Sequence, residues 1–286
     1  MKRNAFGSLM LLTATLIWGT SLVAQSAGVK YLGPFAFTAA RSFLGGIVLL
    51  PVFVTRRRPP AAWPFVPGAF CGAVLFITGA FQQAGIAHTT VGKAGFITSL
   101  YIVIVPLFSF FKGRKPAPFT WGCVFTAVAG MYLLCINERF LLGYGDLLIL
   151  ISAISTAAHI LLVGQLVRKY DAAALSAVQF FACGAIGLAA ALIFEKTTSE
   201  ALLAAWLPVL YTGVLSSGVA YTLQAAGQKY VAPVAAALIL SLESVFSVFA
   251  GWLALGETLS AREAAGCVLM FAAIIAMQLY DTGKKG

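Results

Sequence analysis

The stretch from Pro233 to Glu257, PVAAALILSLESVFSVFAGWLALGE, decides the class of fold, because it is long and apolar yet carries one carboxylate near its middle, Glu243. At about 1.5 Å per residue, a helix over 233–253 is roughly 30 Å long, which matches the hydrocarbon core of a bilayer. A charged side chain at the midplane costs about 2.5–3.5 kcal/mol on insertion scales. We therefore expect Glu243 to face the interior of a helix bundle, a partner or water.

An earlier stretch over 91–113, VGKAGFITSLYIVIVPLFSFFKG, is the counterpart of this one in the first half of the chain. The two align at a shift of about 142 residues, which places Ser99-Leu100 on Ser241-Leu242 and Tyr101 on Glu243. A second match, at a shift of 138, relates 7–43 to 145–181. The chain is therefore predicted to consist of two repeats, 1–136 and 137–286.

The composition is that of a membrane protein, with 60% apolar and 10% charged residues. Windows of about 20 residues predict ten membrane spans. Their limits are 7–26, 34–54, 66–86, 91–111, 119–136, 146–165, 174–194, 207–227, 233–253 and 262–279. Each repeat then holds five spans, so the second repeat enters the membrane in the opposite orientation. Such inverted repeats are typical of secondary transporters, whose substrate site lies between the repeats near the midplane.

The net charge of +10 reflects orientation in the membrane rather than binding to nucleic acid. With the N-terminus in the cytoplasm, thirteen Lys and Arg residues, Arg56-Arg57-Arg58 among them, lie on the inner side and four on the outer side. This asymmetry follows the positive-inside rule and predicts both termini in the cytoplasm. We expect a multi-pass protein of the cell membrane, with the lipid bilayer and a small metabolite as its partners and a monomer as its simplest state.

Two basic residues near the outer ends of spans have two possible roles. Arg41 lies about seven residues into the second span and Lys93 lies near the start of the fourth. Each can extend outward as an anchor, or face a cavity and attract an anionic group. The two roles carry equal weight for Arg41. The anchor role is the simpler one for Lys93, although a cation near a helix N-terminus gains nothing from the helix dipole.

Glutamine and tryptophan side chains within the spans are further candidates for substrate contacts. Gln82 and Gln83 in the third span correspond roughly to Gln224 in the eighth. Buried amides hold helices together, and we assign that role to Gln82 while Gln83 and Gln224 remain open as substrate contacts. Trp18 lies beside a glycine in the first span, where packing is the commoner role, and His159 in the sixth span is expected to be structural.

The chain resembles the EamA-type, ten-helix members of the drug/metabolite transporter superfamily. The matching residues are Trp18-Gly19-Thr20-Ser21, Leu32-Gly33-Pro34 with Arg41, Ala94 to Tyr101 leading to Val105-Pro106-Leu107, Ser241-Leu242-Glu243 and Gly256-Glu257. The chain departs from the family where Ser244 replaces a frequent proline, which affects the expected shape of that helix, and where Gly113-Arg114 stands opposite Gly256-Glu257. The candidates for substrate binding or coupling are Trp18, Arg41, Gln83, Lys93, Tyr101, Gln224 and Glu243.

The resemblance also implies a transporter that moves a small metabolite by alternating access, with export of amino acids or related compounds as the expected direction and cargo. A membrane-embedded enzyme or a non-transporting receptor is the alternative. The sequence holds no G-x-x-x-x-G-K-[ST], H-E-x-x-H or G-x-S-x-G motif, so neither an enzymatic activity nor a cofactor is expected.

Two roles are open for Glu243. It binds and releases a proton if it lines the cavity without a cation, and transport is then coupled to the proton gradient. It stays fixed if it pairs with a cation or caps a broken helix. We favour the fixed role, because its repeat counterpart is the uncharged Tyr101.

Overall fold

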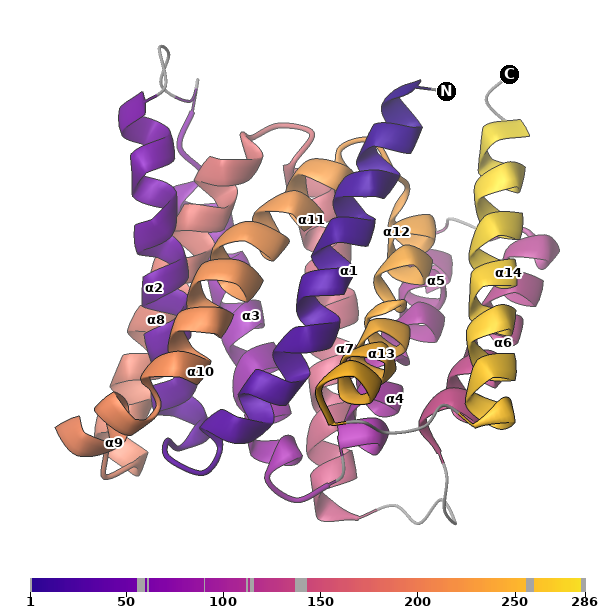
Figure 1. Ribbon diagram of the computed structural model, residues 1–286. Helices are drawn as coiled ribbons and strands as arrows, with labels where there is room; N and C mark the ends of the chain where they lie inside the picture. Colours follow the sequence, from indigo (N-terminus) through magenta and orange to yellow (C-terminus); the bar gives the residue numbers. More distant parts are fainter. Residues whose placement is uncertain are drawn as a thin grey trace.

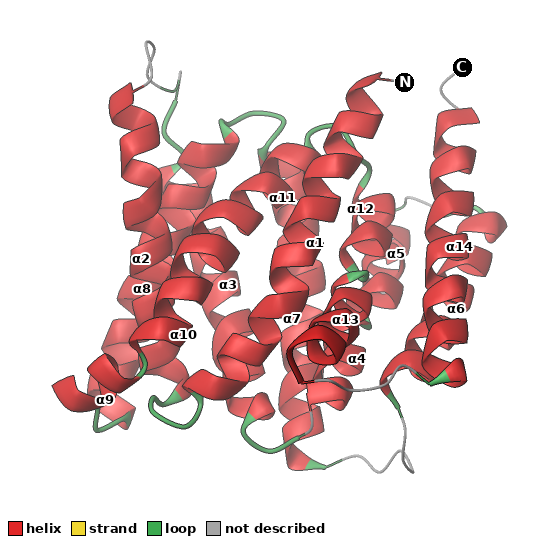
Figure 2. Cartoon of the chain, in the orientation of Figure 1, coloured by secondary structure: helices red, strands yellow, loops and turns green. Residues whose placement is uncertain are grey.

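The computed structural model describes residues 2–55, 60, 62–89, 91–111, 113, 116–136, 143–255 and 260–283. Helices are the regular secondary structure in these ranges, and no strand occurs in them (Figure 2). In chain order the helices are α1 Lys2–Gly28, α2 Pro34–Thr55, α3 Phe65–Ile86, α4 Val91–Ser99, α5 Tyr101–Phe111, α6 Pro118–Cys135, α7 Tyr144–Leu166, α8 Ala172–Phe194, α9 Ser199–Ala204, α10 Trp206–Tyr211, the π-helix η1 Thr212–Ala220, α11 Tyr221–Gln228, α12 Pro233–Leu240, α13 Glu243–Leu255 and α14 Ala261–Gly283. Arg56-Arg57-Arg58, Arg114 and Gly256-Glu257 lie outside the described residues.

The helices have the length and apolarity of membrane spans. Eight segments qualify on both counts, including Lys93–Phe111, which runs through α4 and α5. The two remaining predicted spans coincide with interrupted helices. The span 207–227 coincides with α10, η1 and α11 in direct succession, and the span 233–253 coincides with α12 followed by α13. The prediction of an all-α membrane protein is therefore confirmed. Figure 1 shows both termini on the same face of the bundle, as an even number of crossings requires.

We call the face that carries the termini the inner face, and the opposite face the outer face, after the predicted orientation. The connection from α1 to α2 and the short helix α9 lie at the outer face (Figure 1). Glu195 at the end of α8 closes the outer end of α2, where its two carboxylate oxygens accept hydrogen bonds from the backbone N–H groups of Phe35, at 2.8 Å, and Ala36, at 2.9 Å. A carboxylate is favourable there because a helix N-terminus carries partial positive charge.

The packing of the helices is repeated when the two halves of the chain are exchanged. The contact between α3 and α7 corresponds to the contact between α11 and α1. The contact between α3 and α8 corresponds to the contact between η1 and α2. Helices α2 and α8, and likewise α6 and α14, correspond to each other and pack together. Gly130 on α6 and Gly266 on α14 face each other where these two helices pack. An added Cβ at Gly130 would lie 2.7 Å from the carbonyl oxygen of Gly266, and an added Cβ at Gly266 would lie 2.5 Å from the carbonyl oxygen of Gly130. Only glycine allows so close an approach.

Two helices are broken at matching positions. Leu100 forms a turn between α4 and α5, and Ser241-Leu242 form a turn between α12 and α13. These are the positions that the shift of about 142 residues places on one another. Because Tyr101 begins α5 and Glu243 begins α13, each break puts a polar side chain at the start of a helix inside the bundle.

Candidate functional site

A small polar cavity lies among the helices of both halves. Its volume is about 40 Å³, enough for roughly three water molecules at 10–15 Å³ each. The lining residues are Trp18, Ser21, Leu22, Gln25, Arg41, Thr78, Gln82, Thr98, Tyr101, Thr156, His159, Ile160, Ser216, Tyr221, Gln224, Leu240 and Glu243. Several of them carry charged or hydrogen-bonding groups, which are costly inside a membrane and typical of a functional site there.

The cavity lies where the two repeats meet, because it is lined by pairs of corresponding residues. The pairs are Trp18 with Thr156, Ser21 with His159 and Leu22 with Ile160 at a shift of 138, and Gln82 with Gln224, Thr98 with Leu240 and Tyr101 with Glu243 at a shift of 142. A site on the axis that relates two inverted repeats is the location expected in this kind of architecture.

Arg41 reaches the cavity from α2 and is 5% exposed. Its Nη1 donates a hydrogen bond to Oε1 of Gln25 at 3.2 Å, and no ion pair to Arg41 occurs within the described part of the chain. Gly79 leaves room for the guanidinium, because a Cβ there would lie 2.9 Å from Nη2. Of the two roles open for Arg41, the structure therefore supports the one that faces the cavity.

Glu243 lies on the cavity wall as the first residue of α13 and is 8% exposed. The hydroxyl of Ser99 donates to its Oε1 at 3.4 Å, and Ser99 also exchanges a 2.9 Å hydrogen bond with Ser244. The carboxylate thus lies at a helix break, while no cationic partner is found for it among the described residues. Ser244, which replaces the family's frequent proline, links the two broken helices.

Aromatic rings form another part of the wall. Trp18 and Tyr221 lie with ring centroids 4.6 Å apart, and His159 meets Tyr221 edge to face at 5.8 Å. The indole N–H of Trp18 donates to the carbonyl of Ser216 in the π-helix, and His159 shares a 2.9 Å hydrogen bond with Gln179. π-Helical turns often occur at functional sites, and this one brings a main-chain carbonyl to the cavity.

One buried polar atom on the wall, Oε1 of Gln224, has no hydrogen-bond partner in the described structure, and the Gln224 side chain is 1% exposed. A buried polar group without a partner costs about 1–3 kcal/mol, so such groups are normally satisfied. Gln224 is therefore well suited to contact a polar ligand. The hydroxyl of Tyr101, which is also 1% exposed, interacts with Glu243 instead.

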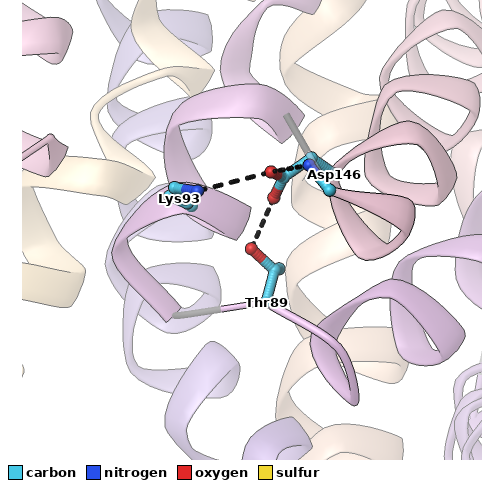
Figure 3. A network of polar contacts seen from close by, with 4 residues as sticks. Thr89, Lys93 and Asp146 are labelled. Atoms are coloured by element: carbon cyan, nitrogen blue, oxygen red, sulfur yellow. Dashed lines mark hydrogen bonds and ion pairs between the residues drawn. The ribbon is translucent and has the colours of Figure 1, made fainter. Parts of the chain in front are cut away.

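Two candidates from the sequence lie elsewhere. Lys93 at the start of α4 forms an ion pair with Asp146 at 3.4 Å, and Asp146 also accepts hydrogen bonds from Thr89 and the backbone N–H of Gly143 (Figure 3). The idea that Lys93 makes the cavity electropositive is thus corrected, because its charge is balanced at the outer end of α7. Gln83 does not line the cavity, and it donates to the carbonyl of Gln25 at 3.1 Å.

Gln82 on α3 donates to Thr98 on α4 at 3.4 Å, which fits its assignment to helix packing. It also lines the cavity, whereas its neighbour Gln83 does not. The shift of 142 pairs Gln82 with Gln224 and could have identified it. His159 is hydrogen-bonded to Gln179, as expected of a structural residue, and it also lines the cavity. Gln25 and Tyr221 carry no signal in the sequence that singles them out. Within the described ranges, no group of three or more His, Cys, Asp or Glu side chains could hold a metal ion.

A bundle of membrane-spanning helices with a polar cavity between two matching halves defines a multi-pass membrane protein of the transporter class. The chain belongs to the EamA-like transporter family, part of the drug/metabolite transporter superfamily, and the family model matches residues 5–136 and 143–279. The resemblance noted in the sequence is confirmed.

Several relatives are similar over nearly the whole chain, and they are named as transporters. An uncharacterized transporter of Archaeoglobus fulgidus is 30% identical over 284 residues, covering 97% of this chain and 87% of the relative. The uncharacterized transporter YwfM of Bacillus subtilis is 32% identical over 297 residues, covering 100% and 97%. The uncharacterized inner membrane transporter YedA of Escherichia coli is 28% identical over 280 residues, covering 94% and 89%.

A crystal structure of another protein has the same fold. It superposes with a TM-score of 0.80 over 98% of this chain and 99% of the other, at 20% sequence identity. At that identity the likeness concerns the fold alone.

Proposed function

We propose that the protein is a secondary transporter that moves a small polar metabolite across the cell membrane by alternating access. The observation that carries this proposal is that Arg41 and Glu243, from different halves of the chain, line one buried cavity. Side chains of this kind are rare inside membranes and mark substrate or ion pathways. The names of the relatives support transport as the activity.

The favoured cargo is an amino acid or a related molecule that carries both a carboxylate and an amine. Arg41 offers a planar guanidinium that binds carboxylates in a bidentate manner. Glu243 offers a carboxylate without a cationic partner among the described residues, which suits an ammonium group or a proton. The aromatic rings of Trp18 and Tyr221 provide an apolar surface beside these charges.

Transport is tested with purified protein in liposomes that are loaded with a mixture of amino acids, small amines and small carboxylates. We expect time-dependent efflux of a subset of amino acids, measured by mass spectrometry, and at least a tenfold loss of that efflux in Arg41→Gln. That loss corresponds to about 1.5–3 kcal/mol for a hydrogen bond to a charged group. The control is Lys169→Gln, which removes an exposed cation at the inner end of α7.

Two outcomes would contradict the proposal. A well-folded protein that releases none of the loaded compounds favours a receptor. Chemical conversion of a compound without its movement across the membrane favours an enzyme.

The direction of export and the cytoplasmic location of both termini are part of the same proposal. The charge asymmetry of the sequence and the common face of the two termini support the orientation. Metabolite profiling of medium and cytoplasm, with and without the protein, tests the direction. Accumulation of the cargo in the medium is expected, and accumulation in the cytoplasm would reverse the assignment.

A further inference from the structure

A groove with an apolar lining lies between α1 and α14, at the ends of these helices that are near the inner face. Its volume is about 630 Å³, and it shares no lining residue with the central cavity. Figure 1 shows α12 between the two helices, and both pack against it. The lining residues are Asn4, Ala5, Ser8, Leu9, Leu12, Ile239, Leu242, Ile274, Gln278 and Leu279.

The groove lies at the level of the membrane. The spans Asn4–Gly28 and Ala261–Tyr280 contain every lining residue that α1 and α14 contribute. Leu9 and Leu279 are 59% and 68% exposed, so the groove is open at the side of the bundle. Lipid is therefore the medium at its mouth.

The lining changes from polar to apolar with depth. Asn4 and Gln278 lie near the inner ends of α1 and α14, and the hydroxyl of Ser8 donates to Oε1 of Gln278 at 3.4 Å. Leu12 and Ile274 lie deeper. The helical rise from Asn4 to Leu12 is about 12 Å, close to half of a hydrocarbon core about 30 Å thick. The groove thus has the depth and the polarity of one leaflet.

Aromatic rings occupy the corresponding positions in the first half. Phe96 and Tyr132 meet edge to face with ring centroids 6.1 Å apart. At the shift of 142, their counterparts are Leu238 and Ile274, and Ile274 lines the groove. The smaller aliphatic side chains of the second half leave space beside α12 that the two rings take up in the first half.

We propose that the groove binds one acyl chain of a phospholipid from the leaflet at the inner face. The chain is apolar and flexible, so it fits an irregular apolar groove, while the polar part of the lipid lies near Asn4 and Gln278. It packs against Ile239 and Leu242, next to the break between α12 and α13. The lipid is then a bound component of the fold, distinct from the surrounding bilayer. The proposal does not depend on the transport function.

Retention of lipid in detergent tests the proposal. Protein is purified in detergent, washed until bulk phospholipid is removed and analysed by native mass spectrometry, and we expect one phospholipid to remain on the parent chain. Ala5→Trp places a ring in the groove and should weaken retention about tenfold, because the ring takes the space of the chain. Ala272→Trp is the control, since Ala272 is exposed on the same pair of helices but does not line the groove. Size-exclusion profiles establish that each variant is folded.

Crosslinking locates the bound chain. One equivalent of a phosphatidylcholine with a diazirine in its acyl chain is added to the washed protein, and the crosslinked peptides are identified after illumination. We expect the crosslinks to concentrate on Leu9, Leu12 and Leu279. Val66 and Phe70 are the reference, because they are 82% and 60% exposed and α3 also begins at the inner face (Figure 1).

Equal retention by Ala5→Trp and Ala272→Trp would overturn the proposal, as would loss of all phospholipid from the parent or equal crosslinking of α3 and the groove. A dimer of the washed parent that Ala5→Trp converts to a monomer would assign the groove to a second copy of the chain instead. The transport function is judged by efflux from liposomes, so the failure of either proposal leaves the other standing.

Discussion

Gly79 on α3 shapes the cavity by having no side chain. A Cβ at this position would lie 2.9 Å from Nη2 of Arg41 and 3.2 Å from Cγ2 of Thr38. The corresponding position in the second half holds Tyr221, whose ring lines the same cavity. The two halves therefore differ in that one leaves space for a cation and the other supplies an aromatic wall.

Gly79→Ala should displace the guanidinium and reduce the transport of carboxylate-bearing cargo about tenfold or more, since a hydrogen bond to a charged group contributes about 1.5–3 kcal/mol. Initial rates of efflux measure the effect. Gly122→Ala on α6 is the control, because nothing lies within 4 Å of an added Cβ there. Equal rates in the two variants would show that Arg41 tolerates the displacement.

Glu243→Gln tests whether the carboxylate carries a proton. The substitution keeps the size of the side chain and its hydrogen-bonding capacity toward Ser99, so we expect normal folding. Because Glu243 lines the cavity without a cationic partner among the described residues, we now expect it to carry a proton, in contrast to the role that the sequence favours. Accumulation of cargo driven by a pH gradient should then be lost while downhill exchange continues, and liposomes with and without the gradient measure both. Loss of folded protein would instead support the fixed, structural role that the sequence favours.

At the scale of the helices, the two breaks bring the halves into contact. Ser99 at the end of α4 and Ser244 in the first turn of α13 are fully buried and share a 2.9 Å hydrogen bond. Ser244 also donates to the carbonyl of Gly95 at 3.5 Å. These hydroxyls connect the broken helices close to Glu243.

Ser99→Ala and Ser244→Ala should each lower the thermal stability of the purified protein, and the double variant should lose less than the sum of the two. The expected coupling is about 0.6–1.7 kcal/mol, the range for hydrogen bonds between membrane helices. Thr126→Ala, which removes an exposed hydroxyl bonded within its own helix, is the control. Additive losses would mean that the two hydroxyls act independently.

The helices were predictable because a bilayer demands long apolar segments, and α2 and α12 begin at prolines that suit a first helical turn. The break between α4 and α5 was not predicted, although the alignment placed Ser99-Leu100 on Ser241-Leu242. A broken helix at Glu243 was considered only as one of two conditions for its fixed role. The π-helix was not predicted either, since its hydrogen bonds depend on packing rather than on local composition.

The position of side chains relative to the cavity was predictable only in part. Trp18, Arg41, Tyr101, Gln224 and Glu243 line it, and their role in binding cargo stays a prediction. The pairing of Lys93 with Asp146 depends on the register between α4 and α7, which the repeat does not reveal. Gln82 and Gln83 differ by one residue, a rotation of about 100° on a helix, and this rotation decides which amide reaches the cavity.

At the scale of the whole molecule, the common face of the termini sets the topology. A fluorescent protein fused to either end should fluoresce in the cytoplasm. Alkaline phosphatase, which is active only outside the cytoplasm, should be active when it is inserted at Lys30, between α1 and α2. Opposite locations for the two termini would contradict an even number of crossings.

The small size of the central cavity has a mechanical consequence. A cavity of about 40 Å³ holds a few water molecules, so a larger metabolite enters only if the helices move apart. Hydrostatic pressure favours the state of smaller volume. Loading of the cargo is therefore expected to have a positive activation volume, and raised pressure should slow transport more for bulky cargo than for compact cargo.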